Sequence, residues 1–121
     1  MTRDAAEIAL HQHVVARRAT DLVYERMPEL AGAYGPHGRH ACERDAAFHV
    51  RFLLASVAIE DRSVFEDYAV WTRDLLARFG IPAAHVAAAF EAVGDALEEL
   101  LPTAAATALP YLEAGEAALG R

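Results

Sequence analysis

The chain has 121 residues and a formal net charge of −7, so it is long enough for one hydrophobic core and we expect a single domain over residues 1–121. Its arginines are interleaved with acidic residues, which argues against a nucleic-acid partner, because such a protein needs a clustered basic surface. It has no apolar run of about 18 residues, no apolar segment typical of a signal peptide, and one cysteine, so we expect no membrane partner and a soluble, cytoplasmic protein.

The composition is rich in alanine and leucine and shows no alternation of period two, which predicts an all-α protein. The first helix is expected from Ala5 to about Met27, with Asp4 as its N-cap, because apolar residues recur there at helical spacing. Pro28 should break this helix, and Gly35-Pro36 should form a turn.

The second helix follows residues 37–40 and is expected to extend to about Ile59. At 3.6 residues per turn, Cys42, Asp45, His49 and Phe52 lie along one side of this helix. A thiol, a carboxylate and an imidazole are thereby placed on or beside a stripe that faces the core.

Asp61 or Ser63 is expected to cap a third helix that runs from Val64 to about Phe79. Spacings of three and four residues in this helix produce an apolar and aromatic stripe. We interpret the stripe first as core packing and second as the wall of a ligand pocket. Its members are Val64, Phe65, Tyr68, Trp71, Leu75 and Phe79.

Pro82 is well placed at the first position of a fourth helix, which ends near Leu101. A last helix is expected from Ala104 to about Leu119. Pro110 lies in the middle of that segment, so we expect the helix to kink or split there.

No catalytic constellation stands out, so we do not expect an enzyme. The sequence has no serine, histidine and acid set at interpretable spacing, no glycine-rich phosphate loop and no paired carboxylates on a core face. His37 and His40 lie one turn apart and could share a zinc ion, but we interpret them as solvated and expect no metal site.

Five segments of the chain match the motifs of one known family: Pro28-Glu29-Leu30, Arg39-His40-Ala41-Cys42-Glu43-Arg44-Asp45, Arg51-Phe52, Asp61-Arg62-Ser63-Val64-Phe65-Glu66-Asp67 and Gly80-Ile81-Pro82-Ala83-Ala84-His85-Val86-Ala87. They resemble the phycobiliproteins of the phycocyanin and allophycocyanin group, whose fold is an elaborated globin. The resemblance implies a globin-like bundle of about five to six helices. Because only 41 residues precede Cys42, we expect a core that lacks the family's N-terminal helical hairpin.

This resemblance implies a bound linear tetrapyrrole, or bilin. By position, Cys42 would form the thioether to ring A, and Asp45 would accept hydrogen bonds from the inner pyrrole nitrogens. Arg44 and Arg39 would be the candidates for pairing with the propionates. A carboxylate near a cationic tetrapyrrole stays ionised and satisfies buried N–H groups, which agrees with this assignment.

A weaker likeness is to the helical sensory domains that precede cobalamin-binding modules in bacterial regulators. Phe48-His49 and the Tyr68-Ala69-Val70-Trp71 segment carry it. Such domains need not hold a chromophore, so a ligand-free domain that forms a homodimer is the first alternative. Haem binding through His49 is a third hypothesis.

Overall fold

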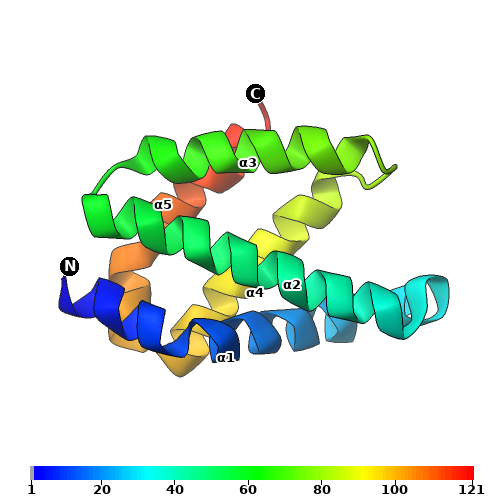
Figure 1. Cartoon of the computed structure of the whole chain (residues 1–121), viewed down its shortest axis with the longest axis horizontal. Coiled ribbons are helices and arrows are strands. Elements are labelled where there is room, and N and C mark those ends of the chain that lie inside the picture. Colours follow the sequence, from blue (N-terminus) through cyan, green and yellow to red (C-terminus); the bar gives the residue numbers. More distant parts are fainter. Residues whose placement is uncertain (1) are drawn as a thin grey trace.

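Five α-helices follow one another in the computed structural model, which describes residues 2–121 (Figure 1). No strand occurs in that range, so the all-α prediction is confirmed. The helices are α1 (Arg3–Arg26), α2 (Glu29–Ile59), α3 (Arg62–Ala77), α4 (Ala83–Leu100) and α5 (Pro102–Ala118).

Helix α1 begins earlier than the sequence predicted. Its N-cap is Thr2, whose hydroxyl accepts a hydrogen bond from the Ala5 backbone N–H at 3.2 Å. Asp4 lies in the first helical turn instead, where a carboxylate still interacts favourably with the helix dipole. The assignment of Asp4 as the N-cap was therefore wrong by two residues.

Helix α2 also begins earlier than predicted, at Glu29, and it is interrupted at the predicted turn. Gly35 has φ 64° and ψ −164°, a conformation that only glycine adopts without strain. Pro36 follows it and disfavours a helical conformation at the preceding residue. The predicted turn is thus a sharp kink within α2, and the segment after it carries Cys42, Asp45 and His49 on one continuous helix.

Helix α3 is capped by Asp61, as predicted, and the Asp61 carboxylate accepts a hydrogen bond from the Ser63 backbone N–H at 2.9 Å. Phe65 and Tyr68 are buried, but Trp71 is 59% exposed and Phe79 is 75% exposed. The prediction of one buried stripe was wrong for these two residues. Trp71 lies at the edge of the buried face, and Phe79 lies beyond the end of the helix.

Helix α5 continues through Pro110, so the predicted split is absent. Pro110 is exposed, and water can therefore reach the carbonyl group that loses its hydrogen-bond partner. Ala108 and Leu112 flank it on the buried side of the helix. The packing of the buried side of α5 outweighs the tendency of proline to interrupt a helix.

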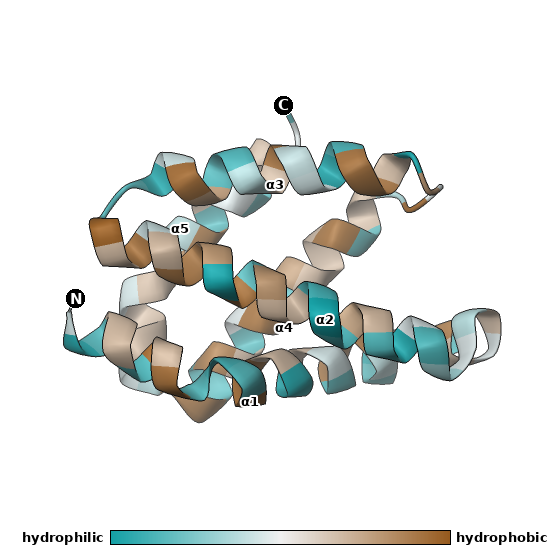
Figure 2. Cartoon of the chain, viewed as in Figure 1, coloured by the Kyte–Doolittle hydropathy of each residue, from teal (hydrophilic) through white to brown (hydrophobic). Residues whose placement is uncertain are grey.

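The helices bury one hydrophobic cluster. In Figure 1, α2 crosses in front of α4 and α5, α1 lies beside α2, and α3 lies on its other side. Helix α1 packs mainly on α2 and α4, and α3 packs mainly on α5. Figure 2 shows hydrophobic and hydrophilic residues alternating along each helix, as expected for helices with one buried side. The largest buried side chains are Phe65, Phe90, Ile8, Leu53, Leu97 and Leu112.

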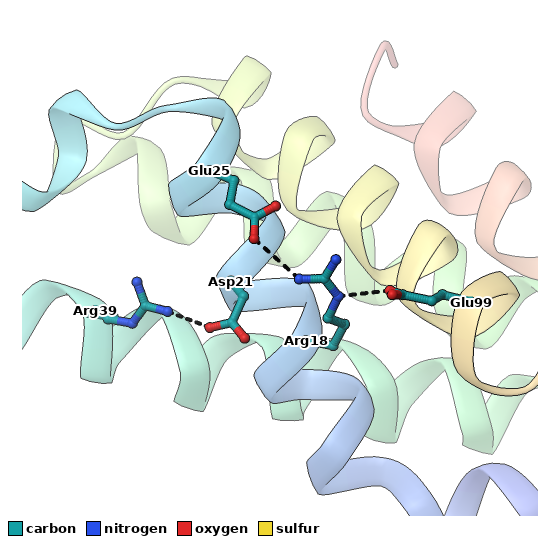
Figure 3. Close-up of polar contacts among 5 residues, drawn as sticks. All are labelled: Arg18, Asp21, Glu25, Arg39 and Glu99. Atoms are coloured by element: carbon teal, nitrogen blue, oxygen red, sulfur yellow. Dashed lines mark hydrogen bonds and ion pairs between the residues drawn. The ribbon is translucent and has the colours of Figure 1, made fainter.

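Ion pairs at the surface link α1 to both of its neighbours (Figure 3). Arg18 pairs with Glu99 of α4 at 2.7 Å, and Arg39 of α2 pairs with Asp21 of α1. All four side chains are substantially exposed, so these pairs fix the approach of the helices more than they add stability. Within residues 2–121, every helix is too short or too polar to cross a membrane.

Candidate functional site

Two adjoining pockets lie on either side of the middle of α2. One of about 200 Å³ lies between α1, α2 and the start of α4, and we call it the α1-side pocket. The other, of about 470 Å³, lies between α2 and α3, and we call it the α3-side pocket. Asp45, His49 and Leu76 line both. Ligand pockets are commonly of roughly 300–1,000 Å³, so the α3-side pocket lies within that range and the adjoining α1-side pocket lies below it.

Cys42 lines the α1-side pocket. Its thiol is half-buried and forms no disulfide. Burial raises the pKa of the Cys42 thiol, with Thr20 acting in the opposite direction and Asp45 adding to the increase. The thiol is therefore protonated at neutral pH and has low intrinsic reactivity.

Asp45 lies one turn after Cys42 and faces both pockets. Partial burial raises the pKa of its carboxyl group, and the neighbouring Arg44, at 3.7 Å, lowers it. Arg44 is exposed and lines the α3-side pocket. A partly desolvated carboxylate beside an exposed guanidinium can bind a ligand that carries both N–H donors and an acidic group.

His49 lies one turn further along α2 and is only 3% exposed. Its Nδ1 atom lies 2.6 Å from the Tyr68 hydroxyl, and its ring packs edge-on against Phe90 with centroids 5.0 Å apart. Burial lowers the pKa of His49 to about 4 and raises the pKa of Tyr68 to about 12. Both side chains are therefore neutral at pH 7.

Aromatic side chains line the outer part of the α3-side pocket. Phe52 stacks on Tyr68 with ring centroids 4.3 Å apart and planes 11° apart. Trp71 lies beyond Tyr68, at 6.3 Å between centroids, and Phe48 lies under the guanidinium of Arg51. The interpretation of Tyr68 and Trp71 as a pocket wall thus fits their positions in the structure.

Arg39 lies outside both pockets. Its guanidinium pairs with Asp21, as Figure 3 shows, and stacks over the Tyr24 ring at 4.8 Å. These contacts hold it on the α1 side of α2. Of the two arginines that the sequence put forward, the structure brings only Arg44 to the pockets.

Some pocket residues could not be recognised from the sequence. His85 and Tyr24 line the α1-side pocket, and Thr72 lines the α3-side pocket. Thr72 is 4% exposed, and within residues 2–121 its hydroxyl has no partner at ordinary hydrogen-bond geometry, although it lies near enough to Tyr68 to lower the pKa of that phenol. Its spacing of four residues from Tyr68 was the one available signal, since this spacing puts the two on the same helix face.

His37 and His40 lie exposed on α2. Across residues 2–121, no three or more histidine, cysteine, aspartate or glutamate side chains gather as a metal site would require.

Comparison with known proteins identifies the family. The family model described as "phycobilisome protein" matches residues 1–119, which is nearly the whole chain. No curated protein and no solved structure matches the chain. The match confirms the predicted resemblance to the phycobiliproteins, and the five helices agree with the all-α, globin-like fold of that family. The chain belongs to the phycobilisome protein family.

Proposed function

We propose that this protein binds a linear tetrapyrrole in the two pockets that meet at Asp45. The observation that carries the proposal is the lining of these pockets within one helical turn of α2: the Cys42 thiol lines the α1-side pocket, the Arg44 guanidinium lines the α3-side pocket, and the Asp45 carboxylate lines both. Membership of the phycobilisome protein family supports the same class of ligand. A pigment-carrying role, and not catalysis, follows from this proposal.

The residues present fit such a group. Asp45 would accept hydrogen bonds from pyrrole N–H groups, and Arg44 would pair with a propionate. Tyr68, Phe52 and Trp71 offer aromatic surface to a flat ligand. The bound tetrapyrrole would supply absorption of visible light, and the pocket side chains would hold it in place.

Cys42 would form the covalent link by addition. A bound tetrapyrrole would supply an exocyclic carbon–carbon double bond on its end ring, and the Cys42 thiol would add across it, with the sulfur joining one carbon and the thiol proton moving to the other. This addition needs no oxidant and releases no leaving group. The raised pKa of the Cys42 thiol makes it slow without help, so we expect attachment to depend on a lyase or on activation by the bound ligand.

The test is an absorption spectrum of the protein co-expressed with a haem oxygenase and a bilin reductase, beside its Cys42→Ala variant. The proposal expects a visible band in the wild-type protein that survives denaturation and a denaturation-sensitive band, or none, in the variant. A visible band that denaturation abolishes in both proteins would mean non-covalent binding and would refute the role of Cys42. A colourless wild-type protein, with no fluorescence on a denaturing gel containing zinc, would refute tetrapyrrole binding.

A matched pair of variants tests the assignment of the arginines. Arg44→Ala should weaken ligand binding because Arg44 lines the α3-side pocket. Arg39→Ala should leave binding unchanged, because Arg39 is held by Asp21 and Tyr24 outside both pockets. Equal losses of ligand affinity in Arg44→Ala and Arg39→Ala would show that Arg44 acts through the net charge of the protein and not through contact with the ligand.

A chromophore-free homodimerisation domain is the second candidate. It is favoured by Leu10 and Val14, which are 79% and 55% exposed one turn apart on α1. Light scattering at micromolar concentration distinguishes the two candidates, because a monomer would exclude a stable dimer. Haem binding through His49 stays a prediction, and an unchanged Soret band in the His49→Ala variant would exclude it.

A further inference from the structure

His49 is a buried polar side chain placed between the two pockets. It lies one turn after Asp45 on α2, is 3% exposed and lines both pockets. The rings of Tyr68 and Phe90 pack against it edge-on, which fixes the orientation of the imidazole. A buried imidazole in a fixed orientation presents each of its two nitrogens to one defined neighbour.

The neighbour of Nδ1 is the Tyr68 hydroxyl, at 2.6 Å. A phenol O–H is a much stronger acid than the N–H of a neutral imidazole, and an imidazole nitrogen is a stronger base than a phenol oxygen. The favoured arrangement is therefore donation from Tyr68 to Nδ1. The distance agrees, because hydrogen bonds with an O–H donor are shorter than those with an N–H donor.

This arrangement places the imidazole proton on Nε2. Within residues 2–121, the one hydrogen bond of the His49 side chain is that to Tyr68, and Nε2 is not among the fully buried atoms that lack a partner, so it borders the pocket space. An Nε2–H that borders a pocket can donate a hydrogen bond to an acceptor on a ligand. Asp45, one turn away, faces the same space as an acceptor, so α2 presents one acceptor and one donor to the pockets.

We propose that His49, held in its Nε2–H form by Tyr68, donates a hydrogen bond to a carbonyl or carboxylate oxygen of the ligand while Asp45 accepts from its N–H groups. The inference rests on the proposed function and adds a residue that fixes how the tetrapyrrole lies along α2. A linear tetrapyrrole carries both groups, since its pyrroles supply N–H donors and its end rings and propionates supply oxygen acceptors.

The proposal and the haem hypothesis require different protonation states of the His49 Nε2 atom. An iron ligand would use the lone pair of Nε2 and keep the proton on Nδ1, where it would be donated to an acceptor. The tautomer of His49 therefore separates the two ligand classes before any ligand is added.

The first experiment measures that tautomer in the ligand-free full chain by two-bond ¹H–¹⁵N correlation NMR at pH 7. We expect the Nε2–H form for His49 in the wild-type protein and a mixture of the two tautomers in Tyr68→Phe. The His49→Gln variant assigns the signals. An Nδ1–H form or a charged imidazole in the wild-type protein would overturn the proposal.

The second experiment titrates biliverdin into the wild-type protein and two variants, followed by absorption and by quenching of Trp71 fluorescence. His49→Leu removes the donor and should weaken binding roughly tenfold, whereas His49→Gln supplies an amide N–H and should recover most of the affinity. Unfolding curves show whether each variant is folded.

The outcomes separate this inference from the function on which it rests. If the wild-type protein does not bind biliverdin, the proposed function fails even if the NMR result is as expected. If the wild-type protein and His49→Leu bind biliverdin equally, with the same absorption maximum, tetrapyrrole binding stands and the role of His49 is refuted. If His49→Leu is unfolded, the biliverdin affinities of His49→Gln and Tyr68→Phe are compared instead. Tyr68→Phe keeps the aromatic ring and loses the group that fixes the tautomer, so weaker binding by Tyr68→Phe supports the role of His49 and equal binding refutes it.

Discussion

Acidification from pH 7 to pH 4 should destabilise this protein, mainly through His49. An exposed histidine in the unfolded chain takes up a proton near the ordinary histidine pKa of 6.5, whereas the buried His49 does so only at about 4. Between these values the unfolded state binds more protons, so the free energy of unfolding falls as the pH falls. The stabilisation from neutral His49 is complete above pH 6.5 and is lost by about pH 4.

The magnitude follows from the two pKa values. The interval from 6.5 to about 4, at about 1.36 kcal/mol for each pKa unit, corresponds to a loss of about 3 kcal/mol in the free energy of unfolding. This is a large fraction of the roughly 5–15 kcal/mol that stabilises a typical domain. The raised carboxyl pKa of Asp45 and of Glu116 acts with the opposite sign, because the folded state then protonates first as the pH falls.

Urea unfolding of the wild-type protein and of His49→Gln at pH values from 7.5 to 4.5 measures this effect. The difference between the two proteins isolates His49, because they share every other titrating group. We expect the wild-type curve to fall more steeply than the variant between about pH 6.5 and pH 4.5. Parallel curves would show that His49 is not a buried neutral imidazole and would remove the basis of its proposed role in binding.

Three further outcomes follow from the structure. Gly115→Ala should destabilise the fold by roughly 1–3 kcal/mol in urea unfolding, because its Cβ would collide with the buried ring of Phe65. Gly32→Ala, where a Cβ meets nothing within 4 Å, should instead stabilise it by roughly 0.4–1 kcal/mol, and equal effects in the two variants would contradict the packing of α3 on α5. Cys42 in the ligand-free protein should react with a disulfide reagent at pH 7.5 several-fold more slowly than a free thiol, and a rate equal to that of free thiol would contradict its raised pKa. A bound pigment should quench the emission of Trp71, the single tryptophan, and binding without quenching would place the ligand away from the α3-side pocket.

The order and type of the helices followed from the sequence, because they depend on local rules. Helical periodicity, the Asp61 cap and the two breaks at Pro28 and Gly35 all operate within a few residues of the chain. The placement of Cys42, Asp45 and His49 on one side of α2 followed for the same reason, since 3.6 residues per turn fixes which side chains share a face. The motifs in this stretch were also sufficient to indicate the family.

The packing of the helices against one another determined the features that local rules did not predict. Whether a face is covered depends on which other helix packs on it, so periodicity alone wrongly buried Trp71. The helix-breaking tendency of proline, taken alone, wrongly predicted a split of α5 at Pro110. The contact between His49 and Tyr68 joins residues 19 positions apart, and that between Arg39 and Asp21 joins two helices. The sequence by itself determined which residues share each helix face. Only the tertiary structure determined which of those residues line the pockets, because a pocket forms where helices distant in the chain fail to fill the space between them.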